Sequence, residues 1–299
     1  MAKHTNKIKK NDEISFKIVA YALVIFCTII AALPFYVLII GSFTPEKQFH
    51  TTGLSLWPSE FTLSAYQYIF KSPEKILNGY KVTIFITVVG TVMALFLTAM
   101  TAYALNRKEF RPRNIISFYF YFTTMFGAGM VPRYLLITQY LHMKNTIWVQ
   151  IIPVLLAATT IIMMRNFVNG IPDSIAESGR VDGASEFTIF LRLYLPLMKS
   201  GLACIGLMTA LGYWNRWDGA MLYIEDETLY PLQYLLYQMT SSAQFLANAV
   251  SESGLPNIEI PSQALKLAMT VITIGPIAFV YPFIQKHFIK GITIGAVKG

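Results

Sequence analysis

Residues 171–197 read IPDSIAESGRVDGASEFTIFLRLYLPL, a charged stretch between two long apolar segments of the chain. Its charged side chains are Asp173, Glu177, Arg180, Asp182, Glu186 and Arg192. Charges at this density cannot lie against lipid without a cost of several kcal/mol. The stretch must therefore face water or a partner protein.

The rest of the chain is strongly apolar. Hydrophobic residues make up 55% of the sequence, charged residues 13%, and the mean hydropathy is +0.50. A membrane-spanning helix needs about 20 predominantly apolar residues. Six segments have that length: 16–41, 82–105, 115–137, 147–167, 201–223 and 265–288. Because backbone polar groups must be paired inside hydrocarbon, we predict an all-α integral membrane protein. A single six-helix domain would cover residues 16–288, between tails at 1–15 and 289–299.

The first apolar segment is preceded by several lysines, as a secretory signal would be. Its apolar run is too long for a signal, and it continues through Pro34 without a small-residue cleavage site. We therefore expect a permanent helix.

The distribution of lysine and arginine predicts the orientation. If the six segments alternate in direction, sixteen of these residues fall on the side of both termini and eight on the other side. Basic residues favour the cytoplasmic side, so both termini of this multi-pass chain are expected in the cytoplasm. This topology accounts for the net charge of +8 without nucleic-acid binding.

Two outer loops, 42–81 and 224–264, follow from this topology. The first contains prolines and aromatic residues, which favours an interfacial helix on the bilayer. The second has a stretch, 225–262, with five acidic and no basic residues, and it is long enough to reach a partner or solute outside.

The charged stretch lies in an inner loop, 169–199, with its own predicted structure. Pro172 suits the first turn of a helix. Gly179 and Gly183 predict that this helix ends or bends there, because glycine allows tight turns and close backbone approach. Residues 184–195 form a second helical run, which Pro196 is expected to break. The product is a short cytoplasmic helix-turn-helix.

This loop resembles the coupling loop of ABC importer permeases, whose signature is EAA followed by G and I-x-LP. Glu177, Gly183 and the pair Leu195–Pro196 have the same order and spacing, while Ser178 and Gly179 stand where the signature has two alanines. The resemblance implies that the loop docks in a cleft of an ATPase subunit. The residues implied in this coupling are Glu177, Ser178, Gly179, Asp182, Gly183, Ala184, Leu195 and Pro196.

The resemblance covers nearly the whole chain and is closest to the second permease of maltose-type carbohydrate importers of bacterial cell membranes. Residues 127–146, GAGMVPRYLLITQYLHMKNT, are similar to the branch that handles oligosaccharides or larger glycans. The resemblance implies a type I importer fold and a heterodimer with a second permease. It also implies an extracytoplasmic solute-binding protein and two ATPase subunits that hold the ATP and Mg, so no cofactor is expected in this chain.

Two further regions have alternative interpretations. The C-terminal residues Gly295, Lys298 and Gly299 are either a frayed end or, as the resemblance implies, a contact with the ATPase dimer. Aromatic and polar residues near the outer end of the fifth segment are either an interface belt or the lining of a sugar path. These residues are Tyr213, Trp214, Asn215, Trp217 and Asp218.

Other chemistries lack their sequence patterns. The four histidines do not have metal-ligand spacing, the chain has no phosphate-binding GxxxxGK[ST] loop, and Cys27 and Cys204 lie inside apolar segments. We therefore expect no metal site and no enzyme activity in this chain. An ion-coupled secondary transporter remains the alternative, although such proteins usually have ionisable residues in mid-membrane.

Overall fold

The computed structural model describes residues 10–253 and 262–278. The chain divides into two compact units, Met1–Lys71 with Thr240–Ile272, and Ser72–Met239 with Thr273–Gly299. Within the described residues all regular structure is helical.

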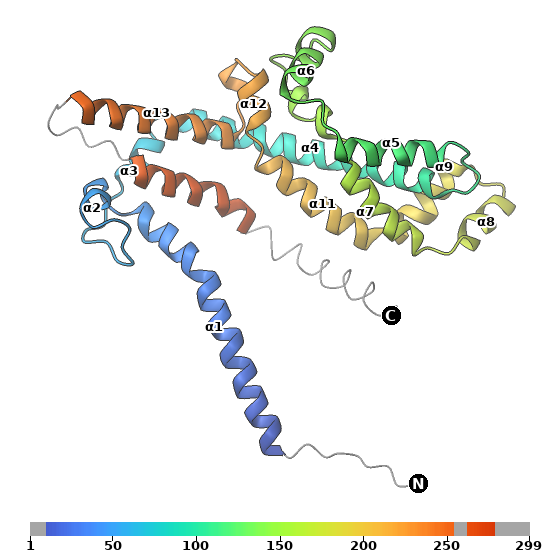
Figure 1. Ribbon diagram of the computed structural model, residues 1–299, viewed down its shortest axis with the longest axis horizontal. Helices are drawn as coiled ribbons and strands as arrows, with labels where there is room; N and C mark the ends of the chain where they lie inside the picture. Colours follow the sequence, from blue (N-terminus) through green and yellow to red (C-terminus); the bar gives the residue numbers. More distant parts are fainter. Residues whose placement is uncertain (1–9, 254–261, 279–299) are drawn as a thin grey trace. The chain divides into compact units, whose positions relative to one another are not determined.

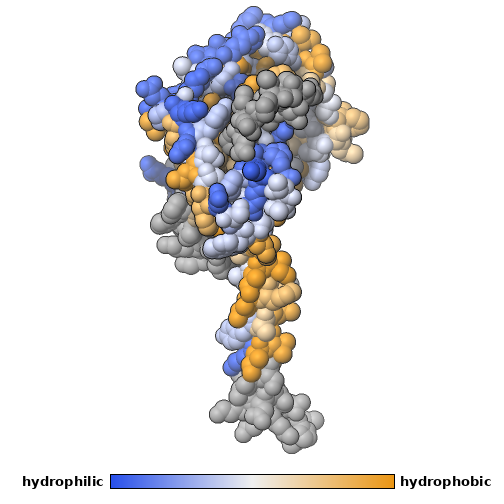
Figure 2. Space-filling view, turned by 90° about the vertical axis from the view of Figure 1, so that its left-hand side faces the viewer, coloured by the Kyte–Doolittle hydropathy of each residue, from blue (hydrophilic) through white to orange (hydrophobic). Residues whose placement is uncertain are grey.

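The first unit begins with α1, Lys10–Ser42, which contains the apolar segment Phe16–Ser42. The side chains of α1 are exposed over most of the described length, and apolar ones cover much of its surface (Figure 2). This 27-residue segment, whose most apolar stretch of 18 residues has no buried residue, has the length and surface of a membrane span. Two short helices follow, α2 at Glu46–Thr51 and α3 at Ser64–Ile69 (Figure 1).

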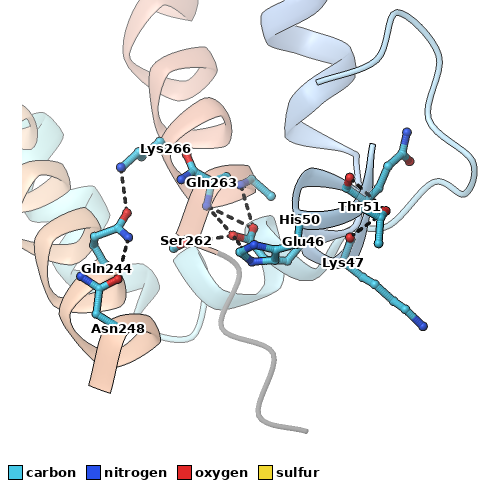
Figure 3. Close-up of polar contacts among 11 residues, drawn as sticks. Glu46, Lys47, His50, Thr51, Gln244, Asn248, Ser262, Gln263 and Lys266 are labelled. Carbon is cyan, nitrogen blue, oxygen red and sulfur yellow. Dashed lines mark hydrogen bonds and ion pairs between the residues drawn. The ribbon is translucent and has the colours of Figure 1, made fainter. Parts of the chain in front are cut away.

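A buried carboxylate joins α2 to the first residues of the helical stretch Ser262–Ala278, which lie in the same unit (Figure 3). The side chain of Glu46, only 4% exposed, accepts hydrogen bonds from the hydroxyl of Ser262 at 2.9 Å and from the backbone N–H groups of Gln263 at 3.0 Å and Ala264 at 3.2 Å. The first N–H groups of a helix have no partner within it, and its N-terminus favours negative charge. Glu46 thus caps a helix more than 200 residues away in sequence.

The second unit is built around α4, Pro73–Asn106, a 34-residue helix. It packs along α11, Lys199–Trp214, and α7, Ala158–Asn169 (Figure 1). Small residues on α4 allow this close packing. The ring of Tyr213 lies directly against Gly90, where an added Cβ would come within 2.6 Å of it.

The remaining helices of the second unit are short. Between α4 and α7 lie α5 (Arg113–Met125), α6 (Met130–Leu135), a π-helical turn η1 (Leu136–Tyr140), and the 3-10 turns η2 (Ile147–Gln150) and η3 (Ile152–Val154). Between α7 and α11 lie α8 (Ser174–Val181), α9 (Glu186–Ile189), a π-helical turn η4 (Phe190–Tyr194) and α10 (Leu195–Leu197). After α11 come α12 (Asp218–Tyr223), η5 (Glu227–Leu229) and α13 (Leu232–Ser253), which runs on into the first unit.

The six predicted spans are not six uninterrupted helices. Among the described residues two helices have the length and apolarity to cross a membrane, Phe16–Ser42 and Pro73–Asn106, and three bent helix pairs raise the number to at most five. The predicted helix 115–137 bends by 118°. Gly129, at φ +81°, adopts a backbone conformation there that suits glycine and not a helix.

Two more predicted spans and both outer loops need correction. The segment 147–167 bends by 52°, and 201–223 is interrupted between Trp214 and Asp218. The last segment, 265–288, is described only as far as Ala278. In the outer loop 42–81 two short helices replace the single interfacial helix, and much of the loop 224–264 is the helix α13.

We predict that Gly90→Ala destabilises the protein. The added methyl group must displace the buried Tyr213 ring, and such overpacking costs about 1–3 kcal/mol. Thermal unfolding in mild detergent measures the loss. The matched control is Gly212→Ala on α11, where an added Cβ meets nothing within 4 Å. An equal melting temperature for the two variants would show that the close contact is not needed.

Glu46→Gln should also lower the melting temperature. The amide keeps the size of the side chain but removes the charge from hydrogen bonds that contribute about 1.5–3 kcal/mol each when charged. The exposed Glu60 offers the control, since Glu60→Gln should leave unfolding unchanged. Unfolding of Glu46→Gln at the wild-type temperature would refute the capping role.

Candidate functional site

The charged loop 169–199 forms a helical hairpin of α8 and α9. The first leg ends in a Schellman motif, in which the N–H of Ala184 donates to the carbonyl of Gly179 at 2.9 Å and that of Gly183 to Arg180 at 3.0 Å. Gly183 takes φ +76°, which this motif requires and other residues rarely adopt. Ser185 then caps α9 by accepting from the N–H of Thr188. The predicted helix-turn-helix is therefore confirmed.

Details of the hairpin differ from the prediction at two positions. Gly179 lies inside α8 and does not end it; an added Cβ there would come within 3.0–3.1 Å of Ile189 and Leu193, so glycine allows the two legs to approach closely. Pro196 lies inside α10, and the sharp bend of 82° follows it, between Glu186–Leu197 and Lys199–Trp214.

The hairpin has an apolar inner face and a polar outer face. Ala176 and Gly179 are buried, and Ala176 packs in a cluster with Ile189 of the second leg. Glu177, Ser178 and Asp182 are exposed, and the Val181 side chain is 88% exposed. Within the described part of the chain Glu177 has no hydrogen bond or ion pair, so its charge is available to a partner.

A buried arginine at the end of α4 holds the hairpin from inside. The side chain of Arg107 is 7% exposed, and its guanidinium lies over the rings of Tyr103 at 5.0 Å and Tyr194 at 4.8 Å. It also donates a hydrogen bond to the Tyr194 hydroxyl at 2.9 Å and lies 3.6 Å from Asp173. Arg107 therefore connects α4, the start of α8 and the π-helical turn η4.

Further ion pairs surround this arginine. Lys108 donates to Asp173 at 3.0 Å, while Arg180 of α8 donates to both Glu109 and Glu186 at 2.7 Å. The hydrogen bond from Lys108 holds the pKa of Asp173 below its usual range, and that from Arg180 does the same for the pKa of Glu109. Both carboxylates thus stay ionised at neutral pH.

This network was not predicted from the sequence. Its signal was present as two facing charge patterns, the basic segment NRKEFRPR at 106–113 and the acidic residues of the loop 169–199. Opposite charges on two inner loops indicate contact between them. The aromatic partners of Arg107 carry no such signal, because tyrosines in helices usually belong to a core.

The five residues of the predicted sugar path do not share one surface. Tyr213 and Trp214 are buried, and they donate hydrogen bonds to the backbone carbonyls of Ile151 at 3.2 Å and Thr273 at 3.3 Å. Asn215, Trp217 and Asp218 are exposed. The role of these five residues in substrate contact stays a prediction.

Two hollows open near these residues. One of about 270 Å³ is lined by Tyr213, Arg216 and residues of α4 and α11. The other, about 960 Å³, is lined by residues 127–140 together with Asp218 and Tyr223. All the residues that line them belong to the second unit.

Two further predictions concern the C-terminal tail and metal binding. The tail residues Gly295, Lys298 and Gly299 lie outside the described residues. Over residues 10–253 and 262–278 no three histidine, cysteine or acidic side chains gather to hold a metal ion.

No family model matches the chain. Protein LplC of Bacillus subtilis is 40% identical over 270 residues, 90% of each chain. The polygalacturonan/rhamnogalacturonan transport system permease protein YtcP of the same organism is 36% identical over 284 residues, 95% of this chain and 98% of its own. The crystal structure of a bacterial ABC transporter involved in the import of the acidic polysaccharide alginate contains a chain with TM-score 0.75 and 30% identity, which covers 94% of this chain and 98% of its own. The protein therefore belongs to the carbohydrate ABC transporter permeases, integral proteins of the cell membrane.

Proposed function

We propose that this chain is one of two permease subunits of an importer that moves an oligosaccharide or larger glycan into the cell, driven by ATP bound on other subunits. The hairpin α8–α9 supports the proposed coupling to the ATPase subunits. Its inner face is fixed to the protein by apolar packing and ion pairs, while its outer face presents Glu177, which is exposed and has no partner among the described residues. The ion-coupled alternative finds no support in the comparisons.

The hairpin has the properties of a rigid lever. Arg107 fastens it to the end of α4, and the chain continues from its second leg through the bend at Met198 into α11. A movement of the hairpin is therefore passed to α4 and α11 together. These two helices form the most extensive packing contact of the second unit, so they move as one body.

The proposed complex contains a second permease, two ATPase subunits and an extracytoplasmic binding protein. In this assembly residues 16–288 form the membrane domain, both termini are cytoplasmic, and ATP and Mg belong to the ATPase subunits. The end of the chain around Lys298 would contact the ATPase dimer. This subunit moves its solute and catalyses no covalent change.

The relatives narrow the solute class. YtcP is named for polygalacturonan and rhamnogalacturonan, and the arabinooligosaccharides permease AraQ of Halalkalibacterium halodurans is 28% identical over 281 residues. The solved neighbour belongs to an importer of alginate. Chains of several sugar units are common to these names, which supports an oligosaccharide or a larger glycan.

The coupling role of Glu177 is tested by Glu177→Lys. We expect normal membrane insertion but at least tenfold weaker co-purification with the ATPase, and no uptake. A charge-assisted hydrogen bond contributes about 1.5–3 kcal/mol, and reversal of the charge adds repulsion. Glu60→Lys, which reverses an exposed charge elsewhere, should leave both unchanged. Gly183→Pro should likewise abolish uptake, because proline cannot take φ +76° or donate the turn hydrogen bond. Normal uptake by Glu177→Lys would contradict the proposal.

The lever is tested by Arg107→Lys. Lysine keeps the charge but cannot stack its head group on both tyrosine rings or form the same fork of hydrogen bonds. We expect the ATPase to bind and hydrolyse ATP, while the ratio of sugar taken up to ATP hydrolysed falls about tenfold. Arg111→Lys on the same loop is the control, because Arg111 is exposed. A normal ratio in Arg107→Lys would separate Arg107 from coupling.

A further inference from the structure

Arg216, just after the end of α11, is a poorly compensated cation. Its side chain is only 13% exposed, and its Nε has no hydrogen-bond partner among the described residues. The acidic group near it is Asp218, whose Oδ2 lies 3.6 Å from Nη2. This separation exceeds the 2.7–2.9 Å or so of a well-formed charged pair. A guanidinium taken out of water with such weak compensation is costly, which marks a functional position.

The backbone near Arg216 makes room for this arrangement. A Cβ at Gly219 would come within 3.1 Å of the Nε of Arg216, so the guanidinium lies across the first turn of α12 where a larger residue would displace it. Arg216 also lines the 270 Å³ hollow beside Tyr213. The side chain is thus held at the border of an open space.

A second arginine, Arg133, interacts electrostatically with Arg216. The positive charge of Arg133, on α6, repels that of Arg216. Arg133 is exposed, has no ion pair with any described residue, and lines the 960 Å³ hollow together with Asp218. Two cations and one carboxylate leave this site with a net positive charge. An anionic group that enters the hollow would relieve the repulsion.

The site lies far from the coupling hairpin. Arg216 follows the last residue of α11, whose 16 residues span about 24 Å from the bend at Met198. Next to it, Trp217 and Tyr237 stack with their ring centroids 4.8 Å apart, and both rings are partly exposed. An aromatic surface beside a cation suits a sugar ring that carries a negative charge.

We propose that Arg216 and Arg133 form a carboxylate-binding site that receives the uronate units of an acidic oligosaccharide. The inference rests on the proposed function and narrows its substrate class. Guanidinium groups match a carboxylate with two parallel hydrogen bonds. Arg216 lines the 270 Å³ hollow, and Arg133 lines the 960 Å³ hollow together with Asp218, which lies 3.6 Å from Arg216. Two relatives are named for acidic polysaccharides, which agrees with a site of this charge.

The test uses the complete importer with its binding protein, reconstituted in vesicles of phosphatidylcholine and phosphatidylglycerol. Uptake of trigalacturonate is compared with that of its methyl ester, which has the same skeleton without charge, and with that of neutral maltotriose. Wild type should prefer trigalacturonate. Arg216→Gln should reduce its uptake about tenfold, which corresponds to about 1.4 kcal/mol, and leave uptake of the ester within about twofold. The binding protein is the same throughout, so its own preference cancels between variants.

Two further variants guard against misfolding. Arg133→Gln changes an exposed side chain and should reduce trigalacturonate uptake about threefold without affecting the ester. Asp218→Asn removes the competing carboxylate, so it should lower the KM for trigalacturonate. Arg111→Gln, an exposed arginine of the basic loop, should change nothing.

Several results would overturn the inference. Equal losses for trigalacturonate and its ester would make both arginines structural. An effect of Arg216→Gln that vanishes in phosphatidylcholine alone would assign the arginines to the anionic headgroup of phosphatidylglycerol. Wild-type uptake of maltotriose but not of trigalacturonate would refute the acidic substrate and keep the proposed importer, whereas no uptake of any of the three would count against both.

Discussion

The burial of one guanidinium determines how the second unit is organised at its hairpin end. Arg107 ends the longest helix of this unit, and it is stabilised by two aromatic faces, a tyrosine hydroxyl and a nearby carboxylate. These partners come from α4, from the start of α8 and from η4. Removal of a charge from water is costly, and such partners offset part of that cost. The position of the hairpin relative to α4 is therefore fixed by what the arginine requires.

The hairpin combines firm attachment with a free surface. Small residues on its inner side, Ala176 and Gly179, let the two legs pack closely, and Ala176 joins the apolar cluster of the second unit. The exposed Glu177, which has no partner among the described residues, takes no part in this packing. An attached inner face and an exposed outer face suit a segment that must keep its shape while another protein moves it. At the far end of α11 the situation is reversed, since Arg216 is enclosed by its own chain without adequate partners.

The sequence predicted the helical class, the hairpin and the role of Gly183, because these depend on local rules of hydropathy and of backbone conformation. The six straight spans were predicted poorly. Hydropathy measures how apolar a segment is, but Gly129 and the residues between Trp214 and Asp218 bend the chain without making it polar. The Arg107 network joins residues up to 87 positions apart, and the burial of Tyr213 depends on Gly90 of another helix. Neither contact leaves a pattern within one segment.

The long sequence separation within the Arg107 network also has a consequence for biosynthesis. Translation at about 5–20 residues per second produces Tyr194 roughly 4–17 s after Arg107. During that interval the guanidinium is still a hydrated charge among the basic residues that follow α4. In the proposed orientation it helps to retain this end of the helix on the cytoplasmic side while the next segments insert. Arg107 thus serves first as a topological signal in the nascent chain and later holds the hairpin to α4 in the folded subunit.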